Sequence, residues 1–189
     1  MTTRRRALAT TAFLTLACSV AHGRPIVSVQ ALLGVSGQAE GGGRASFSEE
    51  LADDLGVMAT VEWPIGWQLR LGGRLGYQQA TGVDSEESYV GIDADLWARF
   101  VFIPGQLEVF AAGALGVSTL TVNDSIAGRG LHAMVGAGAG YPLSPTLRAL
   151  AGVYYDHRAG DPQREVSDAT NELKDVKLSR VLLTAGLAF

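Results

Sequence analysis

Apolar and polar side chains alternate with a period of two in eight segments of this 189-residue chain, and this pattern constrains the fold more than any other feature. The last nine residues show it most simply, because five of them form one apolar set: Val181, Leu183, Ala185, Leu187 and Phe189. In a β-strand, alternate residues point to opposite faces. A strand of about 9–11 residues is also long enough to cross a bilayer at its usual tilt. The pattern therefore predicts an all-β protein whose strands each have one apolar face.

The segments and their connections predict a simple antiparallel order. We expect strands at 26–36, 55–63, 67–77, 89–100, 107–119, 131–141, 146–156 and 177–189. Short turns are expected at 64–66, 103–106 and 142–145, and longer polar loops at 37–54, 80–88, 122–130 and 157–176. An even number of strands with short turns on one side and long loops on the other is typical of membrane β-barrels. The prediction is an eight-stranded antiparallel up-and-down transmembrane β-barrel.

The first residues have the pattern of a secretory signal peptide. Three arginines, at 4–6, precede an apolar run at 7–17 that is too short to span a membrane as a helix, and the small residues Ser19 and Ala21 follow. We expect cleavage after Ala21 or Gly23, so that residues 1–23 are the signal and 24–189 form one barrel domain exported by the Sec route. The single cysteine, Cys18, lies in this segment, and lipid attachment to it is the alternative.

Charged residues are sorted between the expected loops and one face of the strands. Fourteen of the 19 acidic residues fall in the four longer loops. On the apolar face of the expected strands, the only charge is Lys177 at the edge of the last strand. A lysine or arginine that faces lipid near the bilayer centre costs about 2–4 kcal/mol, so this exclusion predicts that the apolar face contacts lipid.

The polar face is expected to fill the lumen with an ion-pair network. An eight-stranded barrel is just wide enough to be filled by its own side chains. Its expected members are Glu62, Arg70, Arg74, Asp93, Asp95, Arg99, Glu108, His132, Arg148, Asp156 and Arg180. The strand registers are expected to pair Tyr77 with Val90, Phe100 with Leu107, and Tyr141 with Leu147. These registers would place the following groups side by side: Arg74 and Asp93, Arg99 and Glu108, and His132 and Asp156.

The last strand resembles the terminal strand of bacterial outer-membrane β-barrels, whose final residue is commonly Phe. Over the whole mature chain, the pattern resembles the small eight-stranded outer-membrane proteins of the OmpA-barrel and OmpX type. The resemblance implies an integral protein of the Gram-negative outer membrane, with lipid and lipopolysaccharide around it. It also implies that Phe189 and Leu187 are the signal read by the barrel-assembly machinery.

Catalytic, metal and cofactor sites are not expected. One family of eight-stranded barrels deacylates lipid A through a His-x-Ser motif, but here His132 is followed two residues later by Met134, and His157 by Ala159. The glycines at 41–43 have no P-loop lysine after them, so they predict a flexible loop rather than a phosphate site. Nothing in the composition points to nucleic acid.

The expected function is a structural or surface-interaction role, with four polar acidic loops outside and a charge-paired lumen. A surface ligand would then bind through 37–54 and 157–176. The alternative is a small gated solute channel of the porin kind. A lipid A-modifying enzyme is the remote alternative.

Overall fold

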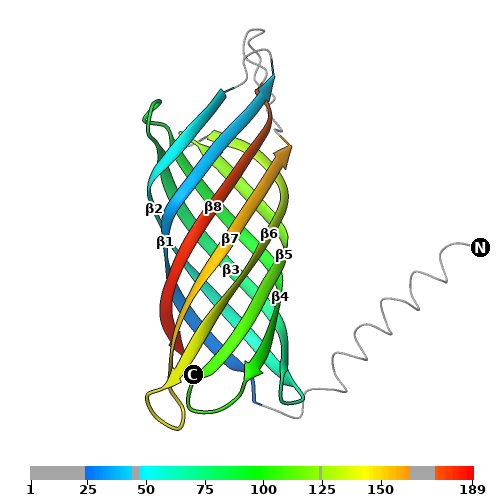
Figure 1. Ribbon diagram of the computed structural model, residues 1–189. Helices are drawn as coiled ribbons and strands as arrows, with labels where there is room; N and C mark the ends of the chain where they lie inside the picture. Colours follow the sequence, from blue (N-terminus) through cyan, green and yellow to red (C-terminus); the bar gives the residue numbers. More distant parts are fainter. Residues whose placement is uncertain (1–23, 44–46, 124, 162–172) are drawn as a thin grey trace, which may run out of the picture.

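The structure is a single closed ring of eight antiparallel strands, which confirms the predicted fold class (Figure 1). It is a computed structural model and describes residues 24–43, 47–123, 125–161 and 173–189. The strands are β1 (Ile26–Gly43), β2 (Phe47–Ile65), β3 (Leu69–Gly82), β4 (Ser88–Ile103), β5 (Glu108–Val122), β6 (Ser125–Pro142), β7 (Arg148–Asp161) and β8 (Leu173–Ala188). Each strand pairs with the next, and β8 pairs with β1. The predicted signal segment and Cys18 lie outside the described residues.

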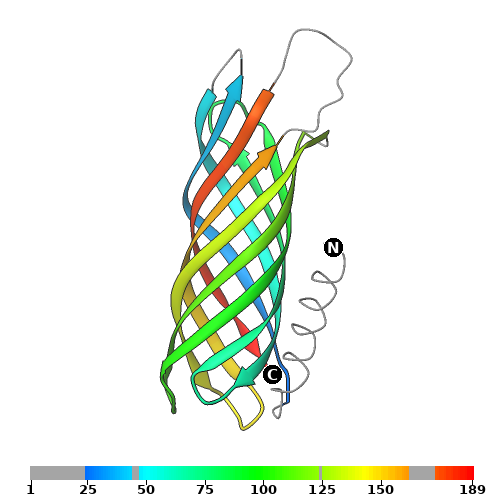
Figure 2. The same cartoon turned by 90° about the vertical axis from the view of Figure 1, so that its right-hand side faces the viewer.

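The strands are longer than the sequence pattern predicted, and much of the expected loop sequence belongs to them (Figure 2). The expected loop at 37–54 falls mostly in β1 and β2, and those at 80–88, 122–130 and 157–176 also lose residues to strands. The expected contrast between short turns and long loops was therefore wrong for three of the four loops. The reason is that strand pairing continues beyond the apolar part of the wall. Outward-facing residues are polar there, and Glu40 on β1, for example, pairs with Lys177 on β8.

The short turns lie at the end of the barrel where the described chain begins and Phe189 lies (Figure 1). The peptide N–H of Val27 donates to the carbonyl of Phe189 at 3.2 Å, and the N–H of Phe189 donates back at 2.8 Å. Gly66 in the first turn has φ 76° and Gly105 in the second has φ 150°. Both are backbone conformations that glycine adopts without steric cost.

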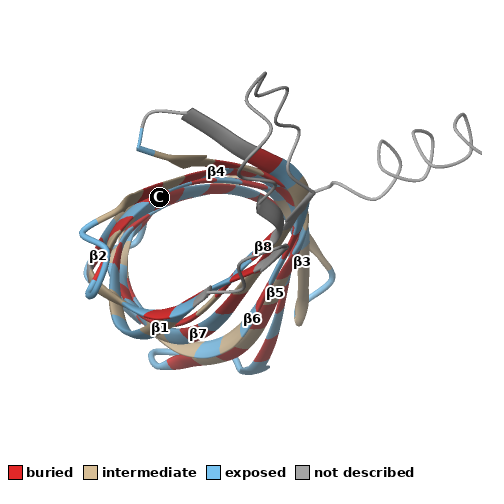
Figure 3. Cartoon of the chain, turned by 90° about the horizontal axis from the view of Figure 1, so that it is seen from above, coloured by how far each residue is buried: buried red, intermediate tan, exposed pale blue. Residues whose placement is uncertain are grey.

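The faces of the strands follow the predicted phase (Figure 3). The large outward residues are apolar and exposed, as Leu96 at 72% and Leu131 at 67% illustrate. Aromatic residues on this face mark the turn end: Trp63, Trp67, Phe100, Tyr141 and Phe189. The described residues include no helix long and apolar enough to span a membrane.

All three predicted registers were wrong, although the faces were right. Tyr77 pairs with Ile92, Phe100 with Ala111, and Tyr141 with Ala149. Each shift is an even number of residues, so inward side chains still point inward. Register in a closed barrel is set by the stagger around the whole ring, which no single hairpin reveals. In β4 a bulge between Val101 and Ile103 also shifts the pairing with β5 by one residue.

Candidate functional site: the barrel lumen

All eleven side chains predicted for the lumen network lie on the inner face of the wall. Nine are buried: Glu62, Arg74, Asp93, Asp95, Arg99, Glu108, His132, Asp156 and Arg180. The other two, Arg70 and Arg148, lie near the turn end and keep 16% and 27% of their side chains exposed. The structure divides the set into a central cluster and a turn-end cluster.

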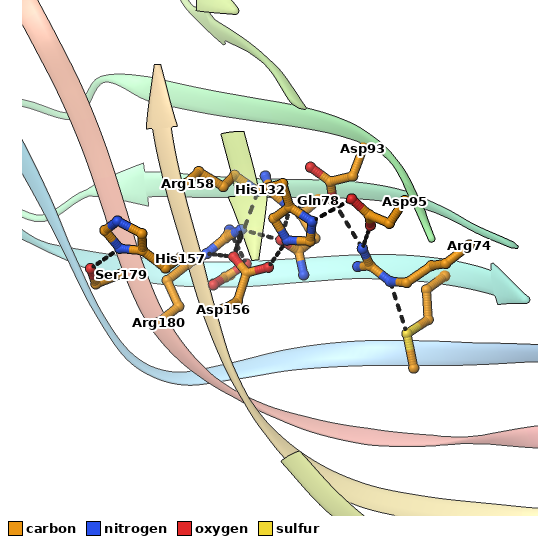
Figure 4. Close-up of polar contacts among 12 residues, drawn as sticks. Arg74, Gln78, Asp93, Asp95, His132, Asp156, His157, Arg158, Ser179 and Arg180 are labelled. Atoms are coloured by element: carbon orange, nitrogen blue, oxygen red, sulfur yellow. Dashed lines mark hydrogen bonds and ion pairs between the residues drawn. The ribbon is translucent and has the colours of Figure 1, made fainter. Parts of the chain in front are cut away.

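His132 on β6 is the middle of the central cluster (Figure 4). Its Nδ1 lies 2.8 Å from an oxygen of Asp95, and its Nε2 lies 2.6 Å from an oxygen of Asp156. An ionised carboxylate accepts hydrogen bonds and cannot donate them. His132 therefore links β4 to β7, and it carries a positive charge when both carboxylates are ionised, because each ring nitrogen must then donate.

Three arginines surround this histidine and its partners. Arg180 reaches Asp156 at 2.7 Å and Asp54 at 3.2 Å. Arg158 lies 2.6 Å from Asp93. Both arginines also donate to the side-chain oxygen of Gln78 (Figure 4).

The third arginine, Arg74, shows how the register error changes a predicted contact. Its closest acidic partner is Asp95, while Asp93 lies 3.6 Å away. Asp95 is its register partner in β4, and the predicted partner was Asp93. The central cluster then contains four positive groups, Arg74, Arg158, Arg180 and His132, and four aspartates, at 54, 93, 95 and 156. With all eight groups ionised, the charges of this cluster balance.

Sequence reasoning missed Asp54, Gln78 and Arg158 as lumen residues. The sequence pattern predicts loops at Asp54 and Arg158, but both are buried in the lumen. Continuing the period-two alternation would have found them, because Arg158 has the phase of Asp156, and Asp54 has the phase of Met58. Gln78 likewise follows Arg74 in phase along β3.

The turn-end cluster is built on Glu62 and Glu108. Arg99 lies 2.9 Å from Glu62 and 4.0 Å from Glu108, so the predicted Arg99–Glu108 contact is the weaker of the two. The Arg99 guanidinium also lies 4.4 Å from the centre of the Phe110 ring. Glu108 accepts from Arg70 through two bonds, of 2.8 and 2.6 Å, and from Arg148 at 2.9 Å.

Apolar side chains fill the lumen around these clusters. Next to the turn-end cluster is a layer that includes Trp97, Phe110, Tyr154, Met58 and Met134. A second apolar group lies toward the opposite end: Ala39, Tyr89, Leu120, Val176 and Leu178. The inside of the barrel is therefore occupied by alternating charged and apolar layers of its own side chains.

At the end opposite the turns, Glu49 ties the connection between β3 and β4 to β2. The Tyr89 hydroxyl donates to its carboxylate, and the Ser85 hydroxyl donates to the same group at 2.7 Å. The backbone N–H of Val83 also donates to the carbonyl of Glu50 at 2.9 Å. The sequence pattern predicts a solvated loop at Glu49, but its side chain is buried and hydrogen-bonded at this rim of the barrel.

The remaining predicted site residues lie on the outer surface. Leu187 and Phe189, proposed as the assembly signal, face outward and are 39% and 60% exposed. His157 bonds to Ser179 at 3.0 Å and is not part of the lumen clusters. Within the described residues, no three His, Cys, Asp or Glu side chains are placed to hold a metal ion.

Three solved structures show what this chain is similar to. The first is the outer membrane protein AlkL, at 14% identity and a TM-score of 0.61 over 88% of this chain and 89% of that one. OprG from Pseudomonas aeruginosa is 7% identical, with a TM-score of 0.55 over 87% and 94%. Neisserial surface protein A is 18% identical, with a TM-score of 0.53 over 86% and 95%. No family model and no curated protein matches the sequence. At these identities the similarity shows the fold alone, a small closed β-barrel like those of these three proteins.

Proposed function

We propose that the protein is an integral outer-membrane barrel with a closed lumen and a structural or surface-interaction role. The observation that carries this proposal is the combination of an apolar outer wall and an interior filled by balanced charges and apolar layers. An apolar outer wall is the surface expected in contact with lipid, because charged side chains on it would destabilise the barrel in the membrane. A filled interior suits an anchor better than a pore.

The surface role rests on the part of the barrel beyond the apolar wall. Strands β1 and β2 extend through sequence rich in polar residues, and the connection 83–87 is hydrogen-bonded to β2 through Glu49 and Glu50. We place the contact with lipopolysaccharide and any surface ligand at this end. Export by the signal segment and recognition of Leu187 and Phe189 by the assembly machinery belong to the same proposal.

Conductance across a planar bilayer tests the closed lumen. The refolded wild-type protein should give no steady current, because the buried side chains of the central cluster and of the aromatic layer occupy the inside of the barrel. An open general porin, inserted under the same conditions, is the positive control. Heat-modifiable gel migration of the recovered protein checks that it is folded. A steady wild-type current would contradict closure and support the solute-channel alternative.

A further inference from the structure

The turn end of the barrel has a cavity that the proposed function does not use. Its volume is about 260 Å³, and it lies between the start of β1, the end of β8 and the connection from β6 to β7. The polar side chains that line it are Arg70, Arg148, Ser144 and Thr146, and Ile26 and Leu147 contribute apolar surface. No Asp or Glu side chain is among the described residues that line it.

The arginine and carboxylate side chains near this cavity are unequal in number. The turn-end cluster contains three arginines, Arg70, Arg99 and Arg148, but only two carboxylates, Glu62 and Glu108. Arg99 forms its closer ion pair with Glu62. Glu108 is therefore shared by Arg70 and Arg148, the two arginines that line the cavity. The central cluster, in contrast, has equal numbers of positive and acidic groups when all of them are ionised. The side chains of the turn-end cluster therefore carry one excess positive charge, in a partly buried place where charges are weakly screened. Phe189 also lines the cavity, and its terminal carboxylate is the negative group with which a bound anion would compete.

The two arginines also keep donors that the described chain does not use. A guanidinium has five N–H groups. Arg70 donates two hydrogen bonds and Arg148 donates one, all to Glu108. Both side chains remain partly exposed at the cavity. Planar guanidinium groups suit the oxygens of phosphate, to which they can donate paired hydrogen bonds.

We propose that this cavity is a binding site for a small phosphate-bearing anion, held by Arg148 and Arg70 with the Ser144 and Thr146 side chains beside it. The lining combines inward strand residues and the turn before β7 with the outward-facing Phe189, so the cavity lies at the rim of the barrel's turn end. The site is separate from the surface role and does not depend on whether the lumen conducts.

Isothermal titration of the full barrel with inorganic phosphate tests the site, in maltoside micelles that contain no phosphate. Wild-type protein should bind saturably, and chloride at equal ionic strength should not replace phosphate. Arg148→Met keeps the length of the side chain but removes its donors, and it should weaken binding roughly tenfold to hundredfold. Arg129→Met is the matched control, because it removes the same charge from an exposed residue near the other end of β6, and it should bind like wild type.

Side-chain NMR of arginine Nε groups gives a second measurement on wild-type protein, should the Arg148 variant not fold. Phosphate should shift the Arg148 and Arg70 signals and leave that of Arg129 unchanged. Competition separates the two sources of phosphate: displacement by phosphatidylglycerol assigns the site to a lipid headgroup, and displacement by glycerol 3-phosphate alone assigns it to a soluble ester. The proposal would be overturned if wild-type protein showed neither saturable phosphate binding nor these NMR shifts. It would also be overturned if Arg148→Met and Arg129→Met lost phosphate affinity to the same extent.

Discussion

At the scale of single residues, Arg99 is the clearest case of a charge that depends on one partner. It is fully buried, 2.9 Å from Glu62, and lies against the Phe110 ring. Glu108 is 4.0 Å away and already accepts three bonds from Arg70 and Arg148. The energetic coupling of Arg99 should therefore be with Glu62.

A double-mutant cycle measures this coupling. Arg99→Met should lower the free energy of unfolding by about 3–5 kcal/mol, because it leaves the Glu62 carboxylate buried without its partner. Adding Glu62→Gln should cost less than the sum of the two single changes. The cycle with Glu108→Gln should be closer to additive. Urea unfolding in lipid vesicles, followed by tryptophan fluorescence, gives the free energies. Stronger coupling to Glu108 would show that the register prediction from sequence had identified the better partner.

The residues that sequence reasoning could assign were those with a strong local pattern. Charges in the middle of a strand, such as Arg99 and Asp93, were placed on the correct face because their neighbours alternate. Arg158 was missed because the residues around it are polar on both faces, and polar sequence resembles a loop. Contact partners such as Glu62 for Arg99 come from different strands, and their proximity depends on the stagger of the whole ring.

At the scale of strands, inward glycines allow neighbouring strands to approach closely. A Cβ added to Gly72 would collide with the backbone of Val61, whose carbonyl carbon would be 2.7 Å away. The next residue, Gly73, points outward, and a Cβ there would meet nothing closer than an oxygen at 3.8 Å. Two adjacent glycines of β3 therefore have opposite tolerance for a side chain.

Alanine at each of these positions tests this difference. Gly72→Ala should destabilise the barrel by about 1–3 kcal/mol, the usual cost of overpacking. Gly73→Ala should be neutral or slightly stabilising, because alanine loses less backbone entropy than glycine. The midpoint of urea unfolding is the measurement. Equal effects at the two positions would mean that the inward glycines are not required by strand packing.

At the scale of the whole molecule, the barrel is taller than the apolar layer that it would cross in the proposed outer membrane. A strand of 19 residues such as β2, rising about 3.3 Å per residue at a tilt of about 40°, spans roughly 48 Å. The apolar band of an outer-membrane barrel is only about 25 Å tall. The excess lies on the side away from the turns, where Glu40 and Lys177 are neighbours across β1 and β8.

This geometry predicts which residues are accessible outside the cell. Ser48 on β2 and Ser144 in the turn between β6 and β7 are both exposed but lie at opposite ends of the barrel. A cysteine at Ser48 should react on intact cells with a maleimide that cannot cross the membrane, and a cysteine at Ser144 should react only after the cells are opened. If only the Ser144→Cys variant is labelled on intact cells, the barrel has the opposite orientation in the membrane.

The closure of β8 on β1 has a consequence for the order of events in folding. Ser28 pairs with Ala188, so the two ends of the described chain must meet before the ring is complete. Until then, β1 and the last strand formed each expose an open hydrogen-bonding edge, the kind of edge on which chains aggregate. Contacts between residues so distant in sequence also form slowly. A nascent chain of this protein therefore remains vulnerable until its last strand arrives, and protection during that interval is as much a requirement of this fold as its apolar wall.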